Sequence, residues 1–118
     1  MPGISIHVVD VSRGVVAEAM RVELYRIGAD GAAGLVAAGG IARDGLLRHE
    51  ALAQVFAPGF YEARFHVGEF YAGAAGETTA VPFLDVVAYR FGLADGRAHY
   101  HLPMKCTPWG YSCFRGGA

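Results

Sequence analysis

Apolar and polar side chains alternate every second residue over long parts of the chain. The alternation is clearest at residues 4–10, 20–27 and 60–67. In the first segment, Ile4, Ile6 and Val8 alternate with Ser5, His7 and Val9. Because successive side chains of a β-strand point to opposite faces of the sheet, each segment predicts a strand with one apolar face.

Less regular apolar runs predict the other strands, and glycine-containing turns separate them. The further strands are expected at residues 34–41, 81–92, 98–105 and 111–115. Turns are expected at Arg13-Gly14 and Asp44-Gly45, and residues 68–75 are the one segment that suggests a helix. About seven or eight short strands with regular turn signals predict an all-β sandwich, which we expect to be a single domain over residues 1–118.

Composition excludes several classes of protein. Hydrophobic residues make up 53% of the chain and charged residues 18%, which excludes a disordered chain. The net charge is −1 and no basic cluster is present, which argues against binding to nucleic acid. No apolar run reaches the roughly 18 residues of a membrane span. The first residues lack the pattern of a signal peptide, so we expect a cytoplasmic protein.

The two cysteines, Cys106 and Cys113, are expected to be reduced thiols. A disulfide is unusual in a chain without an export signal, and no second group of ligands completes a structural zinc site. Cys106 is a weak candidate nucleophile, because only Lys105 lies nearby in sequence to lower the pKa of its thiol.

Histidine is the residue type best suited to proton transfer near neutral pH. The chain contains His7, His49, His66, His99 and His101. His99 and His101 share one face of a predicted strand, and Tyr100 and Leu102 lie on the other, core-facing side. Three interpretations stay open: half-exposed polar residues, a proton-transfer site, or a zinc site made by His7, His99 and His101.

Several segments resemble one known family in the same order along the chain. The string HYHLPMKCTPWGYSCFRGG at residues 99–117 is similar to the C-terminal signature of the 5-hydroxyisourate hydrolases, the transthyretin-related proteins. ISIHVVD at residues 4–10 resembles their first strand. Residues 59–73 and 81–95 resemble their aromatic-rich and Pro-Phe-Leu-Asp segments. The resemblance therefore covers nearly the whole chain.

This resemblance implies both a fold and a reaction. The fold would be a transthyretin-like β-sandwich of two four-stranded sheets with one short helix. The assembly would be a homotetramer, a dimer of dimers, in which histidine-bearing strand faces line a channel and the C-terminal tail closes the site. The reaction would be the hydrolysis of a small heterocyclic substrate, 5-hydroxyisourate, by attack of water on an acyl carbon. No metal or organic cofactor is implied.

Individual residues match the motifs of the family. His7 matches the histidine of the first strand, and His101 matches the second histidine of His-Tyr-His, so the resemblance implies that these two activate water. His99 matches the first histidine of that motif, and Arg115 matches the arginine of the tail. These two residues are the implied contacts to the substrate.

Two positions depart from the family pattern. Leu46 stands where the family has the arginine of Asp-Gly-Arg, and a leucine offers neither charge nor a hydrogen bond. Arg48 lies two positions on, would share a strand face with Leu46, and is the residue placed to substitute in part. In the tail, Gly117 replaces a serine and Phe114 replaces a tyrosine, so two hydroxyl groups are missing. Leu46, Arg48 and Gly117 are therefore counted among the substrate-binding positions.

These departures leave other functions open. One is a divergent ring-transforming enzyme that acts on another cyclic amide or imine, for example in secondary metabolism. Another is a non-catalytic carrier of small ligands, as transthyretin is, which the apolar Leu46 would suit. Trp109 is expected to pack beside a turn, with a stacking surface for a flat ligand as the alternative.

Overall fold

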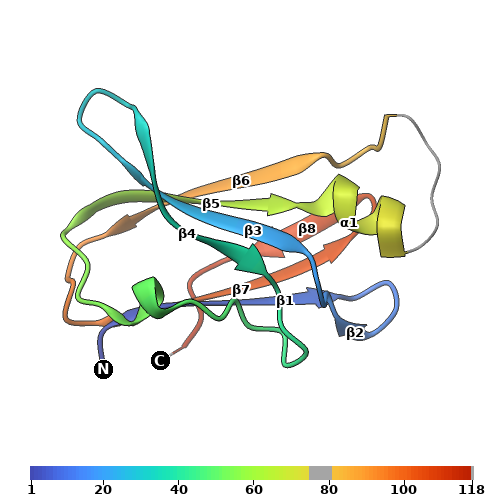
Figure 1. The fold of residues 1–118 in the computed structure, drawn as a ribbon, viewed down its shortest axis with the longest axis horizontal. Coiled ribbons are helices and arrows are strands. Elements are labelled where there is room, and N and C mark those ends of the chain that lie inside the picture. The colour runs from blue at the N-terminus through green and yellow to red at the C-terminus, as the bar shows by residue number, and fades with distance from the viewer. Residues whose placement is uncertain (75–80, 118) are drawn as a thin grey trace.

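The predicted strands assemble into two four-stranded sheets in the computed structural model, which describes residues 1–74, except the side chain of residue 74, and residues 81–117 (Figure 1). The first sheet has the order β2-β1-β7-β8 and contains β1 (Gly3–Asp10), β2 (Val15–Val16), β7 (His99–Thr107) and β8 (Gly110–Cys113). The second has the order β4-β3-β5-β6 and contains β3 (Arg21–Ile27), β4 (Ala33–Gly40), β5 (Gly59–His66) and β6 (Val86–Leu93). The predicted architecture is confirmed.

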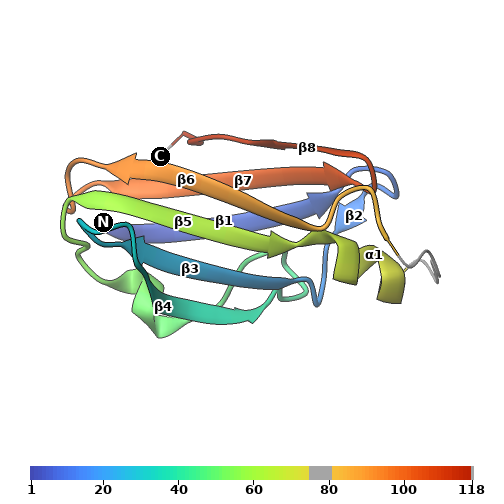
Figure 2. The ribbon, with the colours of Figure 1, turned by 90° about the horizontal axis from the view of Figure 1, so that it is seen from above.

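One short helix follows β5, one of the two central strands of the second sheet, as expected. This helix, α1 (Val67–Ala74), begins one residue before the predicted segment 68–75, whose last residue lies outside the described part of the chain. It continues directly from β5 and lies at one end of the sandwich (Figure 2). In the described part of the chain, no helix has the length and apolar character needed to cross a membrane.

Four local features differ from the sequence-based prediction. The strand expected at residues 81–92 begins only at Val86, because residues 81–85 form an irregular segment beside α1. The two-residue strand β2 was not expected, because so short a strand shows no periodicity. The 3₁₀ helix η1 (Glu50–Ala53) was also missed; the Nδ1 atom of His49 caps it by accepting a hydrogen bond from the amide of Ala51 at 3.1 Å. The last strand ends at Cys113 rather than at Arg115, although the tail stays beside β7, where the amide of Gly116 donates to the carbonyl of His101.

The core lies between the two sheets and is built from the apolar half of each alternating segment. β1 and β7 run parallel, with Ile4 opposite Tyr100, Ile6 opposite Leu102 and Val8 opposite Met104, all buried. From the second sheet, Val22, Leu24, Ala63 and Phe65 are buried as well. Full burial of one such large apolar side chain stabilises the fold by about 1.5–3 kcal/mol. The opposite face of β1 and β7 is thereby left to the polar residues.

A buried carboxylate anchors the end of β1 to the helix. Asp10 is fully buried and accepts hydrogen bonds from the hydroxyl of Tyr71 at 2.6 Å, the hydroxyl of Ser12 at 2.6 Å and Nε of Arg13 at 2.6 Å. Burial alone would raise the pKa of Asp10, but these three donors outweigh burial and hold its pKa below the ordinary value. The charged form of Asp10 therefore stabilises the folded state.

Replacing Tyr71 by phenylalanine should reduce stability without changing the shape of the core. The substitution removes one donor from a buried carboxylate, and we expect the free energy of unfolding to fall by about 1–3 kcal/mol. Because the pKa of Asp10 is lowered on folding, this contribution is present above the unfolded pKa of about 3.9 and disappears as the pH falls through the folded value.

Urea denaturation at neutral pH and in acid measures this effect. Tyr89→Phe is the matched control, since Tyr89 is half-buried and its hydroxyl has no hydrogen bond to any described residue. Equal stability of the two variants at neutral pH would contradict the role given to Tyr71.

Candidate active site

Three of the five histidines gather on the outer face of the first sheet. The parallel register places Ser5 opposite His101, Gly3 opposite His99 and His7 opposite Pro103. The side chains of Ser5, His7, His99 and His101 are all half-buried on this face. His49 and His66 lie elsewhere. His49 caps η1, and His66 lies on the second sheet, where its Nε2 atom is 3.0 Å from Oε1 of Glu23. We call His7, His99 and His101 the histidine cluster.

Ser5 joins two members of the cluster. Its hydroxyl oxygen lies 2.8 Å from Nε2 of His99 and 2.6 Å from Nδ1 of His101. His99 and His101 thus share one small polar group, and their rings are held in fixed orientations. In the described part of the chain, Nε2 of His101 has no protein hydrogen-bond partner and remains available to a bound molecule.

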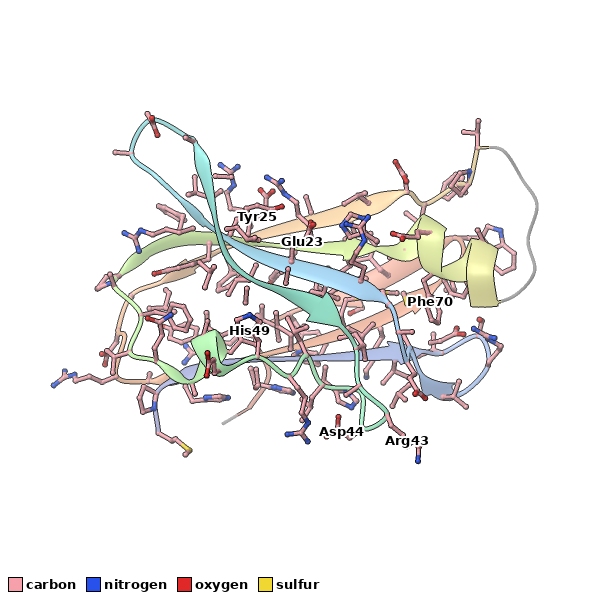
Figure 3. All side chains as sticks on the ribbon, in the orientation of Figure 1. Glu23, Tyr25, Arg43, Asp44, His49 and Phe70 are labelled. Carbon is pink, nitrogen blue, oxygen red and sulfur yellow. The ribbon has the colours of Figure 1, made fainter. Side chains whose placement is uncertain are left out.

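His7 is held by the turn that contains Asp44 and Gly45. Its Nε2 atom lies 3.1 Å from the carbonyl oxygen of Asp44, which can only accept, so Nε2 carries the hydrogen. The neutral ring then has its lone pair on Nδ1. Arg43 and Asp44 project from the tip of this turn (Figure 3). The amide of Val8 donates to the carbonyl of Gly45 at 2.9 Å, which fixes the turn against β1.

Gly45 is required by the close approach of this turn to His7. Its φ of +87° lies in the left-handed region, which favours glycine. A Cβ atom at this position would lie 2.8 Å from Cδ2 of His7 and 2.9 Å from Cγ1 of Val16. The position of the His7 ring therefore depends on the absence of a side chain at residue 45.

Electrostatics favour the neutral form of His101. Burial is the largest cause that lowers the pKa of His101, and the positive charges that His7 and His99 can carry lower it further. A histidine with a lowered pKa is neutral at pH 7 and keeps a lone pair that can accept a proton.

The C-terminal tail is attached to β7 beside His101. The amide of Gly116 donates to the carbonyl oxygen of His101 at 2.7 Å. A Cβ atom at Gly116 would lie 2.8 Å from Cδ2 of His101 and 3.1 Å from Cδ of Pro103, so the tail backbone packs directly on the histidine ring. Gly117 is exposed and has open space around it.

Arg115 is oriented by the same strand. Its guanidinium carbon lies 3.9 Å from the centre of the Tyr100 ring, and one terminal nitrogen donates to the carbonyl of His99 at 3.5 Å. Arg115 is exposed, but its guanidinium lies over Tyr100, on the core-facing side of β7, so within one chain it contacts the backbone of His99 and not the histidine rings.

Leu46 and Arg48 lie along the free side of β1. Leu46 pairs with His7 in an antiparallel bridge and is half-buried, so an apolar side chain lies beside the His7 ring. The amide of Leu47 donates to the carbonyl of Ile6 at 3.0 Å, and continuing this register brings Arg48 level with Ser5. Arg48 is 67% exposed and forms an ion pair with Asp44.

The arrangement does not fit a metal ion. Within residues 1–74 and 81–117, no group of three His, Cys, Asp or Glu side chains is arranged to hold one. His99 and His101 direct ring nitrogens at the same hydroxyl group, and His7 directs Nε2 at a carbonyl. The zinc hypothesis for the three histidines therefore has no support.

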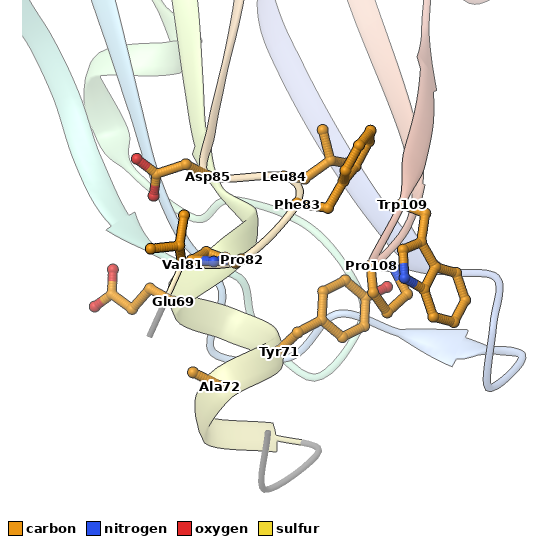
Figure 4. A pocket seen from close by; sticks show the side chains of 11 residues that line it. Glu69, Tyr71, Ala72, Val81, Pro82, Phe83, Leu84, Asp85, Pro108 and Trp109 are labelled. Atoms are coloured by element: carbon orange, nitrogen blue, oxygen red, sulfur yellow. The ribbon is translucent and has the colours of Figure 1, made fainter. Parts of the chain in front are cut away.

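The cysteines and Trp109 lie away from the cluster. Both cysteines are free thiols; burial raises the pKa of Cys106 and raises that of Cys113 to about 11, which argues against a nucleophile. The expectation that Trp109 packs beside a turn was wrong, since Trp109 is 71% exposed. It borders a pocket of about 620 Å³ between α1, residues 81–85 and Pro108 (Figure 4).

Sequence reasoning missed three residues that shape the cluster. Ser5 shares the outward face of its strand with His7, and this alternation was the available signal. Gly45 stood out only as a turn residue, and Gly116 only as part of a tail motif. Their close approaches to His7 and His101 depend on contacts between distant parts of the chain.

Nearly the whole chain is similar to known proteins. The family model described as HIUase/Transthyretin family matches residues 4–116. A 5-hydroxyisourate hydrolase of Deinococcus radiodurans is 38% identical over 98% of this chain and 96% of its own length. The 5-hydroxyisourate hydrolase of Halalkalibacterium halodurans is 40% identical over 96% of each chain.

Solved structures show the same fold. The 5-hydroxyisourate hydrolase of Klebsiella pneumoniae has a TM-score of 0.79 and 26% identity, over 99% of this chain and all of that one (100%). An (S)-allantoin synthase has a TM-score of 0.86 and 37% identity over 98% of this chain, but this chain spans only 43% of that longer one. Sea bream transthyretin in complex with thyroxine has a TM-score of 0.85 at 22% identity, covering 98% of this chain and 96% of that one, which supports the fold alone.

Proposed function

Because this chain belongs to the HIUase/Transthyretin family, we propose that it is a hydrolase of 5-hydroxyisourate. The reaction would open the six-membered ring of the substrate by attack of water on an acyl carbon. Curated relatives of matching length carry this name, at 38% and 40% identity. The structural observation that carries the proposal is the histidine cluster, in which the Nε2 atom of His101 is available to a bound molecule.

His101 and His7 are the proposed water-activating pair. The Nε2 atom of His101 takes a proton from water as the oxygen attacks the acyl carbon, and the lowered pKa of His101 supports its neutral state before the reaction. His7 presents its Nδ1 lone pair to the same face and orients the water or a ring N–H of the substrate. His99 acts through Ser5 and contacts the substrate at the edge of the cluster.

The residues around the cluster are proposed to hold the substrate. Arg48 is an exposed guanidinium level with Ser5, and Arg115 is an exposed guanidinium on the tail, next to the backbone of His99. Such planar forks bind the carbonyl oxygens and the developing oxyanion of a heterocycle. Leu46 supplies an apolar wall beside His7. Gly117 leaves space at the tail, where a side-chain hydroxyl would otherwise lie.

The direct test is the ultraviolet absorbance of freshly generated 5-hydroxyisourate. The protein should accelerate the decay of the substrate well above the rate in buffer. A panel of related cyclic amides and imines in the same assay tests a shifted substrate preference. A folded protein that accelerates neither 5-hydroxyisourate nor any compound of the panel would reject the hydrolase function.

A second candidate function is the non-catalytic binding of a flat ligand. The specific observation in its favour is the half-buried Leu46 beside His7, which makes this part of the face more apolar. Calorimetric titration with planar aromatic compounds separates the two functions. Tight binding without turnover of any substrate would favour the carrier, and turnover of 5-hydroxyisourate would exclude a purely binding role.

We also propose a homotetramer, a dimer of dimers, in a reducing, cytoplasmic compartment. β6 ends one sheet and β8 ends the other, and such edges can pair with a second chain. Large apolar side chains are exposed on and beside these two strands: Val81, Phe83, Val86, Trp109, Tyr111 and Phe114. An exposed apolar patch of this kind is typical of an interface between chains. The two free thiols agree with a reducing environment.

Light scattering coupled to size-exclusion chromatography should give about four times the chain mass of 12.5 kDa. Trp109→Glu should lower the measured mass, because it places a charge in the apolar patch. Ala29→Glu, an exposed change in the loop between β3 and β4, is the control and should leave the mass unchanged. A monomeric mass for the unmodified protein would contradict the assembly.

A further inference from the structure

Ser5 occupies a position that determines how protons are arranged in the histidine cluster. A serine hydroxyl has one hydrogen to donate and lone pairs that accept. It lies within hydrogen-bond distance of one ring nitrogen of His99 and one of His101, at 2.8 and 2.6 Å. Because the hydroxyl has only one hydrogen, it can donate to at most one of these two nitrogens, and the other nitrogen must then carry a hydrogen of its own.

The backbone determines the direction of this chain of hydrogen bonds. The Nδ1 atom of His99 faces the carbonyl oxygen of Pro2 at 3.5 Å, and a carbonyl can only accept. Nδ1 of His99 therefore carries the hydrogen, and Nε2 of the neutral ring accepts from the hydroxyl of Ser5. The oxygen of Ser5 then accepts from Nδ1 of His101, which leaves the lone pair of His101 on Nε2.

We propose that Ser5 is a positioning residue that holds neutral His101 in the Nδ1–H tautomer and shares with His99 the proton that His101 takes up. The arrangement keeps the lone pair of His101 on the only ring nitrogen that faces away from Ser5. When Nε2 of His101 accepts a proton, the Nδ1 proton can pass to the oxygen of Ser5 while the Ser5 hydroxyl proton passes to Nε2 of His99. Two bonds to hydrogen break and two form, and the positive charge moves to His99.

Other features of the cluster agree with this role. A neutral histidine can carry its hydrogen on either ring nitrogen, so a protein that needs one tautomer must supply the hydrogen-bond partner that selects it. Burial and the charges of His7 and His99 keep His101 neutral, so the tautomer is defined at pH 7. The other titratable or charged groups on this face are His7 on β1, Lys105 on β7, and Asp44 and Arg48 on the turn segment. The Arg115 guanidinium lies over Tyr100, on the opposite side of β7.

The first test reads the tautomer without any substrate. Nitrogen-15 NMR of the histidine rings distinguishes a protonated Nδ1 from a protonated Nε2. In the unmodified protein His101 should have its hydrogen on Nδ1, and in Ser5→Ala this preference should be lost. Ser5→Thr keeps a hydroxyl and should restore it. An Nε2–H tautomer of His101 in the unmodified protein overturns the proposal, whether or not the protein proves to be a hydrolase.

The second test rests on the proposed hydrolase function and measures 5-hydroxyisourate turnover against pH. Ser5→Ala should lower kcat by about 10- to 100-fold with KM changed less than about two-fold, since part of the contribution of a positioned base is lost. The acid limb of the pH profile should move as well, because His101 no longer shares its proton. Ser5→Thr should recover most of the rate. A Ser5→Ala enzyme with an unchanged rate and pH profile overturns the proposed role.

Discussion

Replacing His101 by glutamine should remove most of the turnover of 5-hydroxyisourate. Glutamine keeps a polar side chain of similar length but cannot take a proton from water at neutral pH. A positioned general base contributes roughly 10²–10⁴-fold to the rate, so we expect kcat to fall by about that factor. The fold should be retained, because His101 lies on the outer face and not among the buried apolar residues.

The pH dependence of the unmodified enzyme provides an independent check. Turnover needs neutral His101 and should decrease as the pH falls through the pKa of this residue. Because burial and the neighbouring histidines lower that pKa, the decrease should occur below the ordinary histidine value of about 6.5. The His101→Gln enzyme should lack this limb of the profile.

A histidine outside the cluster serves as the control. His49→Gln changes a side chain that caps η1 and has no contact with the cluster, so its kcat should match that of the unmodified protein. If His101→Gln and His49→Gln were equally active, His101 could not be the base, and the mechanism proposed for the cluster would fail.

Replacing Gly45 by alanine should displace the His7 ring, because Gly45 lies in the turn that packs against this ring. The added methyl group would lie too close to the His7 ring and to Val16, so the ring or the turn must move. The left-handed φ of Gly45 adds strain of about 1 kcal/mol for any residue other than glycine. We expect kcat to fall by about 10- to 100-fold, since a misplacement of about 1 Å can cost two orders of magnitude.

Gly31→Ala separates the two causes. Gly31 has a φ of +85°, and a Cβ atom there would meet nothing within 4 Å. This variant should lose stability through backbone strain but keep its turnover. Gly45→Ala should lose more stability and also turnover, as measured by thermal unfolding and the absorbance assay. Equal turnover of the two variants would show that His7 tolerates displacement or does not take part.

Most of the fold could be predicted from local pattern, and part of the site from motif resemblance. Alternation in residues 4–10 identified which side chains of β1 face the core, and the same reasoning placed Tyr100 and Leu102 inside. The resemblance singled out His7, His99 and His101, which the structure places on one face. It also suggested that Arg48 replaces the missing arginine at the substrate. This remains a prediction, because the contact that the structure shows for Arg48 is its ion pair with Asp44.

The sequence by itself determined which side chains of β1 and β7 point away from the core, because a strand repeats every two residues wherever it lies. Only the tertiary structure decided which of them meet. Ser5 contacts rings that lie 94 and 96 positions later in the chain, and that pairing depends on the parallel register of two strands. Such a register is set by the packing of both sheets together, which no local stretch of sequence contains.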